Sequence, residues 1–138
     1  MKRKICGLLI VIVAFTGILL TGCSSGAKEK KVSDLDYTVI GESDIPEELR
    51  VIIEDKQTAA FKLTYSSKDF LYIAVGYGTQ ATGGYSITVD NLYLGENGIY
   101  VNTNLIGPSE GEVQAEAASY PYIVIKMPYR EERVIFDA

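Results

Sequence analysis

The sequence contains no histidine and only two cysteines, and these shortages narrow the chemistry that the chain can perform. Without histidine, a Ser-His-Asp triad and a His-ligated metal site are excluded. No Asp/Asn array has the spacing of an EF-hand calcium loop. A two-carboxylate glycosidase stays open, although a domain of about 100 residues leaves little room for a substrate cleft. We therefore expect no enzyme, and no catalytic residue, metal or cofactor.

The first 22 residues have the layout of a secretory leader. Residues 2–4 are basic, residues 5–20 are apolar or small, and Leu20-Thr21-Gly22-Cys23 resembles a bacterial lipobox. The resemblance implies cleavage before Cys23 and lipidation of its sulfur and amino group. A retained transmembrane helix is the alternative, but 16 residues fall short of the roughly 20 that span a bilayer. Because two acyl chains anchor stably, we expect a lipoprotein on the extracytoplasmic face of a bacterial membrane, in an inner, outer or single-membrane envelope.

Removal of the leader leaves an acidic chain. The leader carries three of the 13 Lys and Arg residues and no acid, so 10 basic residues remain against 18 acidic ones, a net charge of -8. Phosphate repels such a chain, so nucleic acid is not an expected partner. Cys6 leaves with the leader and Cys23 carries lipid, so we expect no disulfide in the mature protein.

The mature chain divides into a linker and one domain. Residues 24–36 are small or charged, with few apolar side chains among them. This composition is typical of a flexible linker. We therefore assign residues 23–36 to a flexible tether and residues 37–138 to a single folded domain.

One amphipathic helix is predicted near the start of the domain. Asp44 can cap it, Glu47 is the capping-box partner, and Pro46 suits the first turn. Apolar side chains recur on one helical face, so we expect core packing rather than a partner-binding or membrane-binding role. These side chains are Ile45, Leu49, Ile52 and Ile53.

The rest of the domain has strand patterns. Asp69–Val75 is an apolar run, as in a strand buried on both faces. Residues 85–89 alternate, and the alternation slips near Asp90–Asn91, which predicts a β-bulge before the hairpin turn at Gly95–Gly98. Six or seven strands and one helix predict an α+β domain on a mostly antiparallel sheet, of sandwich or barrel type. Further strands are expected at Tyr37–Ile40, Ala60–Tyr65, Ile99–Leu105, Tyr122–Met127 and Arg133–Asp137, the last two forming a hairpin across Pro128–Glu131.

A glycine motif, Gly76-x-Gly78-x-x-Ala81, fits the dinucleotide-binding pattern. That pattern requires a helix after the glycines, because the helix N-terminus holds the pyrophosphate. Here a period-2 strand pattern begins at Tyr85 instead. We therefore predict a strand-to-strand loop, in which glycines supply positive φ and close backbone approach.

Tyrosine is abundant, with ten residues, and tryptophan is absent. An apolar ring with a polar hydroxyl suits a binding surface, and it equally suits the half-buried strands expected for most of the ten. The best exposed candidates lie beside predicted loops. They are Tyr77, Tyr85, Tyr120, Tyr122 and Tyr129.

Two motifs occur together: T-G-G-Y at residues 82–85 before an alternating strand, and Y-P-Y at residues 120–122 before an aliphatic strand ending at Lys126. With Gly78, the glycine hairpin and Pro108, they resemble the C-terminal domain of the protease complex subunit PrcB family over residues 71–127. Members of that family are often lipoproteins. The family takes its name from an accessory lipoprotein that supports a surface protease without being one, and it supplies no catalytic residues.

Two functions of different classes are expected from these features. The first is a non-catalytic interaction module that binds another envelope protein, which the resemblance implies is a protease. The acyl chains on Cys23 would anchor this module in the lipid bilayer. The second is a small-ligand or glycan-binding surface lipoprotein with Tyr77, Tyr85 and Tyr122 as its platform. The candidate interaction surface is Tyr77, Thr82, Gly83, Gly84, Tyr85, Tyr120, Pro121 and Tyr122.

Overall fold

Two four-stranded sheets and one α-helix make up the part of the chain that the computed structural model describes, residues 30–111 and 116–136. The elements are β1 (Lys31–Asp34), β2 (Thr38–Ile40), the 3-10 turn η2 (Glu42–Asp44), α2 (Glu47–Lys56), β3 (Ala60–Ser66), β4 (Phe70–Tyr77), β5 (Ser86–Gly95), β6 (Ile99–Ile106), β7 (Tyr122–Pro128) and β8 (Val134–Phe136). The predicted leader and Cys23 lie outside the described residues, so both stay predictions.

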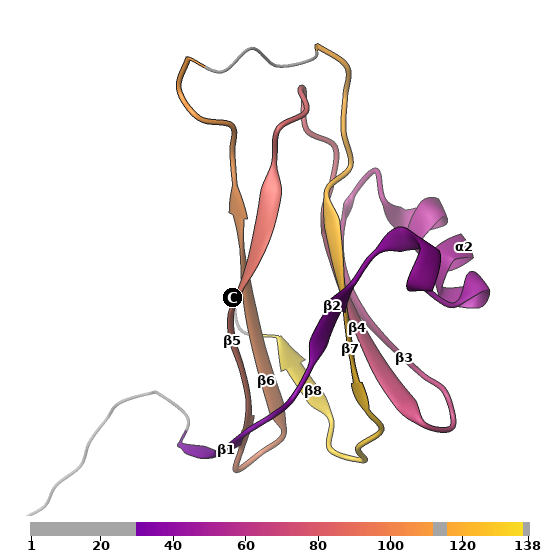
Figure 1. Ribbon diagram of the computed structural model, residues 1–138, viewed down its shortest axis with the longest axis vertical. Helices are drawn as coiled ribbons and strands as arrows, with labels where there is room; N and C mark the ends of the chain where they lie inside the picture. The colour runs from indigo at the N-terminus through magenta and orange to yellow at the C-terminus, as the bar shows by residue number, and fades with distance from the viewer. Residues whose placement is uncertain (1–29, 112–115, 137–138) are drawn as a thin grey trace, which may run out of the picture.

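The strand orders are β1-β5-β6-β8 in one sheet and β2-β7-β4-β3 in the other. We call them the β5–β6 sheet and the β4–β7 sheet. They face each other, and α2 covers the outer side of the β4–β7 sheet (Figure 1). The predicted α+β class is confirmed, with layers of the sandwich type and no closed barrel among the described strands.

Strand β4 lies between β7 and β3, and it is buried on both faces as its apolar run predicts. Leu71, Ile73 and Val75 belong to the cluster between the two sheets. Tyr72 and Ala74 belong to the cluster under α2. Because a buried aliphatic side chain contributes about 1.5–3 kcal/mol, this one strand ties both core layers together.

The helix packs on the core as predicted, but it begins later than its capping motif indicated. Leu49 and Ile53 are buried against the β4–β7 sheet. Asp44 ends η2 and makes no cap, and Pro46 stands at the N-cap position without a side-chain hydrogen bond. The reason is steric, since a residue before proline avoids helical geometry. Ile45 is accordingly extended, with φ -79° and ψ 130°, and separates the two turns.

The hairpin of β5 and β6 agrees closely with the sequence pattern. Its register shifts between Val89 and Asn91, so the predicted bulge is confirmed. The turn runs from Gly95 to Gly98, and Gly98 has φ 152°. An added Cβ at Gly98 would lie 2.6 Å from the Arg133 carbonyl oxygen, so the next segment of chain approaches this turn closely.

The first strand, β1, lies inside the segment predicted as a tether, so that prediction is wrong for Lys31–Asp34. β1 pairs antiparallel with the end of β5, with Asp34 opposite Tyr93. All four of its side chains are exposed. Its attachment depends on backbone hydrogen bonds, which every residue except proline can donate. Leu35 then packs against the core between the sheets.

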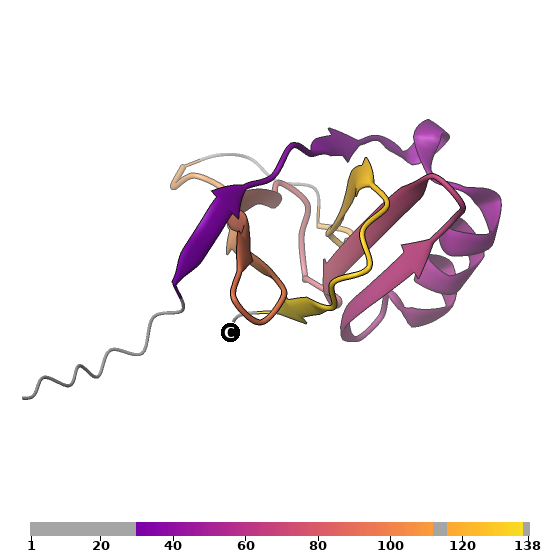
Figure 2. The same ribbon diagram turned by 90° about the horizontal axis from the view of Figure 1, so that it is seen from below.

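The last strand, β8, does not form the predicted hairpin with β7. It pairs in parallel with β6 in the opposite sheet, with Val134 beside Ile99. Strand β7 has no edge free for it, because β4 pairs along one side and β2 along the other. The chain therefore crosses between the sheets after β7, as it does between β1 and β2 on another side (Figure 2).

Candidate functional site

Two loops are joined at one end of the sheets: residues 78–85 between β4 and β5, and residues 119–121 before β7. The Gln80 N–H donates to the Ser119 carbonyl at 2.8 Å, and the Ser119 N–H donates to the Gln80 carbonyl at 3.0 Å. The Ser119 hydroxyl donates to the Thr82 carbonyl at 2.7 Å. We call these segments the paired loops, because three hydrogen bonds hold them together.

Two glycines set the course of the first loop, since Gly78 has φ 80° and Gly84 has φ 90°. Gly78 also lies against the backbone at the start of β3, where an added Cβ would come within 3.1 Å of the Ala60 nitrogen. Gly83 has neither constraint, because its φ is not positive and nothing lies within 4 Å of an added Cβ. The loop leads into β5, so the predicted strand-to-strand connection is confirmed.

Tyr77 was predicted as an exposed contact residue, and the structure gives it another place. Its hydroxyl and the Thr103 hydroxyl are 2.5 Å apart and share a hydrogen bond. The ring is half-buried and packs against the cluster between the sheets. Tyr77 therefore connects β4 to β6 through its hydroxyl, and its role in a contact surface stays a prediction.

A hollow of about 270 Å³ lies beside the paired loops. It takes residues from β2, from β5 with its preceding loop, and from β7 with its preceding loop. We call it the Tyr85–Tyr122 hollow. Its lining is Val39, Tyr85, Ser86, Ile87, Pro121, Tyr122 and Ile123. The fold thus brings together three of the predicted contact residues, Tyr85, Pro121 and Tyr122.

The five other predicted contact residues do not line this hollow. Thr82 fixes the first loop, since its carbonyl accepts from Ser119 and its hydroxyl donates to the Gly83 carbonyl at 3.1 Å. Tyr120 is 38% exposed beside the hollow.

The sequence prediction missed Val39, Ser86, Ile87 and Ile123 as lining residues, and Gln80 and Ser119 as loop partners. The sequence shows Ser119 directly before the Y-P-Y motif, but it does not indicate that Ser119 bonds to Thr82, 37 residues earlier.

The two tyrosines of the hollow are held differently. The Tyr85 ring lies against Gly107, where an added Cβ would be 3.4 Å from the ring edge. Tyr122 also packs against the cluster under α2. Burial raises the pKa of the Tyr122 hydroxyl above 10.0, and the nearby carboxylates of Glu42 and Glu54 raise it further. Tyr122 is therefore neutral at physiological pH and presents a hydroxyl that can both donate and accept.

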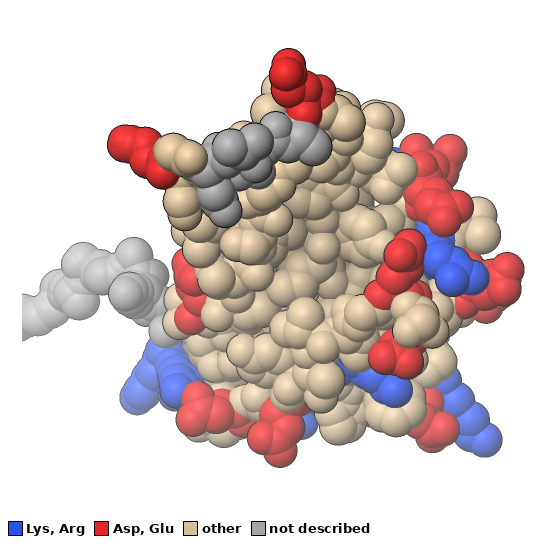
Figure 3. Space-filling view, turned by 45° about the horizontal axis from the view of Figure 1, so that its top comes forward, with Lys and Arg blue, Asp and Glu red and all other residues tan. Residues whose placement is uncertain are grey.

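The hollow lies in an uncharged surface. None of the seven residues that line it carries a charge. Figure 3 brings this end of the molecule forward and shows a broad area without charged side chains, with acidic and basic side chains at its margins. Depletion of charge at the centre of a surface, with charge at its rim, is typical of protein–protein contact sites.

The remaining shifted pKa values come from surface pairs outside the hollow. A hydrogen bond of 2.6 Å to Glu48 raises the pKa of the Tyr65 hydroxyl. Arg130 donates twice to Glu132, at 3.0 Å each, and lowers the pKa of that carboxyl. Across residues 30–111 and 116–136, no group of three His, Cys, Asp or Glu residues could hold a metal ion. Within the same residues, no helix is long and apolar enough to cross a membrane.

The two loops and six of the seven residues that line the hollow lie in a segment that matches a known family. Residues 71–128 match the family model described as PrcB C-terminal. The PrcB C-terminal segment extends from the second residue of β4 to the end of β7. It therefore includes both paired loops and strands of both sheets, while α2, β1, β2, β3 and β8 lie outside it. Comparisons with curated proteins and with solved structures give no match. The family match suggests a subunit that is associated with a protease complex.

Proposed function

We propose that the protein is a membrane-anchored, extracytoplasmic and non-catalytic accessory subunit, which binds a protease partner through the Tyr85–Tyr122 hollow and the paired loops. Acylated Cys23 would hold the protein on the membrane, and the residues before β1 would join it to the domain. Stabilisation of the bound protease is the role that this arrangement suits, because the site offers contact surface and its lining contains no ionisable acid–base pair.

One observation carries the proposal: six of the seven residues that line the hollow lie within the PrcB C-terminal segment. This overlap between the family match and the hollow supports the choice of the hollow as the contact site. The hollow is uncharged and includes two tyrosines and a proline. Tyrosine gives a large contact area at a low cost in side-chain entropy, and it is enriched at protein interfaces.

Rigidity of the site favours a protein partner as well. Three hydrogen bonds fix the paired loops before any partner arrives. A preformed surface loses little conformational entropy on binding, so more of the contact energy appears as affinity.

A small ligand or glycan is the second candidate, and the concavity between Tyr85 and Tyr122 favours it. Two findings weaken it. Tyr77, the third member of the predicted platform, bonds to Thr103 in the core. The hollow of about 270 Å³ also falls below the range of about 300–1,000 Å³ usual for ligand pockets.

Co-purification from native membranes tests the proposal. A tagged wild-type chain should retain a protease or a protease-complex subunit, identified by mass spectrometry. Tyr85→Lys places a charge in the uncharged hollow and should abolish that retention. Tyr129→Lys is the matched control, because Tyr129 is exposed and lies after β7, at the opposite end of the sheets. Equal retention of the protease by both variants would show that the hollow is not the contact site.

A further inference from the structure

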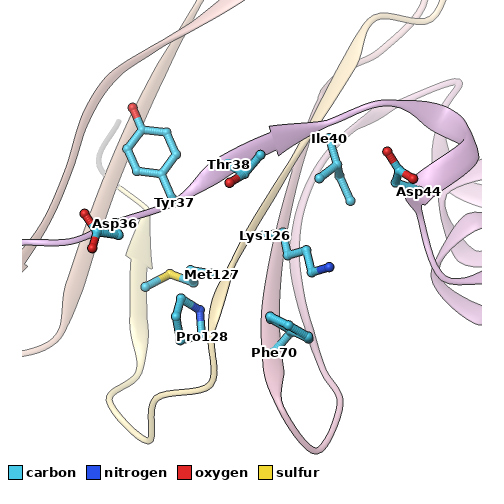
Figure 4. Close-up of a pocket in the computed structure, with 9 residues that line it drawn as sticks. All are labelled: Asp36, Tyr37, Thr38, Ile40, Asp44, Phe70, Lys126, Met127 and Pro128. Atoms are coloured by element: carbon cyan, nitrogen blue, oxygen red, sulfur yellow. The ribbon is translucent and has the colours of Figure 1, made fainter.

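A second hollow, of about 520 Å³, runs along β2 from Asp36 to Asp44 (Figure 4). Its apolar lining includes Ile40, Phe70 and Met127, and its one cationic residue is Lys126. The volume lies inside the range of about 300–1,000 Å³ that small-molecule sites occupy. The lining is mixed, because five of its nine residues are polar or charged: Asp36, Tyr37, Thr38, Asp44 and Lys126.

Lys126 is exceptional among the described lysines. Lys30, Lys31, Lys56, Lys62 and Lys68 are exposed, whereas Lys126 is half-buried. Its ammonium lies 4.1 Å from the centre of the Phe70 ring. It forms no ion pair with any described carboxylate, although the described residues are rich in acid. The hollow therefore leaves the Lys126 ammonium available to an anionic ligand, and N⁺–H···O⁻ hydrogen bonds are among the stronger ones.

We propose that this hollow binds a carboxylate carried on an apolar body, with Lys126 as its counter-ion. The Phe70 ring supports the ammonium from below by a cation–π contact. The apolar body of the ligand lies along Ile40 and Phe70, on the same face of the β4–β7 sheet as Lys126. The chemistry fits the carboxyl end of a peptide and equally a free alkyl acid.

The hollow also contains two carboxylates, so an anionic ligand is favoured only near Lys126. Asp36 and Asp44 lie toward its two ends, with Lys126 between them (Figure 4). A ligand carboxylate is repelled from both ends and attracted to the centre. The bound anion therefore lies over β7 and β4, and the apolar body lies along β2.

This site is separate from the Tyr85–Tyr122 hollow, because no residue lines both. Lys126→Met therefore leaves co-purification with a protease unchanged, and Tyr85→Lys leaves carboxylate binding unchanged. Failure of one proposal can be told from failure of the other.

A chemical-shift titration of the full-length protein tests the inference. N-acetylphenylalanine supplies a carboxylate on an aromatic body, and N-acetylphenylalanine amide has the same body without the charge. We expect the acid to bind at least about tenfold more tightly than the amide, because hydrogen bonds to charged groups are the stronger ones. Octanoate distinguishes the sources: tighter binding of octanoate identifies an alkyl acid, and tighter binding of the acetylated residue identifies a peptide end.

Lys126→Met should abolish the preference for the acid, since methionine keeps an unbranched apolar stem and loses the charge. Lys62→Met, at an exposed lysine on β3, should leave it intact. Phe70→Leu keeps Lys126 and should reduce the preference severalfold. Equal binding of acid and amide, a preference that survives Lys126→Met, or no saturable shift around Lys126 with any of the three probes would overturn the proposal.

Discussion

The hydroxyl of Ser119 donates to the carbonyl of Thr82 at 2.7 Å, across 37 positions of sequence. With the backbone pair between Gln80 and Ser119, this bond makes one rigid unit of two loops. The segment matched by the family model contains both ends of the bond. The contact surface proposed here is therefore stabilised by a bond between its own parts, and this relationship can be tested directly.

Ser119→Ala should lower the free energy of unfolding by about 1–2 kcal/mol, because the partly buried Thr82 carbonyl loses its donor. Partner affinity should fall more than stability, since the loops must then be ordered on binding. Ser66→Ala is the matched control, at an exposed serine of β3. Urea unfolding measures the first effect and co-purification the second. A Ser119→Ala protein with unchanged unfolding would contradict this role for the bond.

Tyr77→Phe removes the hydroxyl that bonds to Thr103 between the sheets. We expect a loss of about 1–2 kcal/mol in the free energy of unfolding, because the part-buried Thr103 hydroxyl loses its partner. Tyr129→Phe, at a tyrosine that is 47% exposed, should be close to neutral. Partner binding by Tyr77→Phe should be retained, since Tyr77 does not line the hollow. If Tyr77→Phe loses partner binding while its free energy of unfolding is unchanged, Tyr77 belongs to the contact surface.

Gly76→Ala should destabilise the β4–β7 sheet, because an added Cβ would lie 2.1 Å from an atom of the Phe61 ring. Phe61 pairs with Gly76 across β3 and β4, and its ring covers the glycine. Overpacking of this kind costs about 1–3 kcal/mol. Combining the change with Phe61→Leu should recover part of the loss, which a double-mutant cycle detects. Gly83→Ala is the control: nothing lies within 4 Å of a Cβ added at Gly83, so the midpoint of unfolding should not change.

Stability should decline at alkaline pH through Tyr122. Burial, then Glu42 and Glu54, raise the pKa of its hydroxyl above 10.0 in the folded protein. The folded state therefore keeps a proton that the unfolded state has lost. The contribution to the free energy of unfolding is complete below pH 10.0 and is lost as pH rises through the raised pKa.

Urea unfolding at several pH values on either side of 10.0 measures this decline. Tyr122→Phe should reduce it, and Glu42→Gln should reduce it less, because burial is the larger cause. An identical pH profile for wild type and Tyr122→Phe would exclude this tyrosine as the group responsible.

Local periodicity predicted much of the fold. The run at Asp69–Val75 became a strand buried on both faces, and the slip at Asp90–Asn91 became a bulge. Both depend on which side chains face the core, and alternation records this directly. The T-G-G-Y motif lies in the segment that the family model matches, although Gly84 rather than Gly83 has the positive φ.

Pairing between distant segments could not be predicted in the same way. β1 has four exposed side chains, so nothing in its composition distinguishes it from a linker. β8 joins β6 because both edges of β7 are occupied, which is a property of the assembled sheet. The hollow has the same origin, since Val39, Tyr85 and Tyr122 meet only after the two sheets are packed.

Site-specific photo-crosslinking in intact cells is the most direct test of the central claim. A photoreactive residue replaces Tyr85 in one strain and Tyr129 in another, and captured proteins are identified by mass spectrometry. We predict that position 85 captures one envelope protease or protease-complex subunit and that position 129 does not. Capture of the same protein equally from both positions, or of no such protein from position 85, would contradict the account.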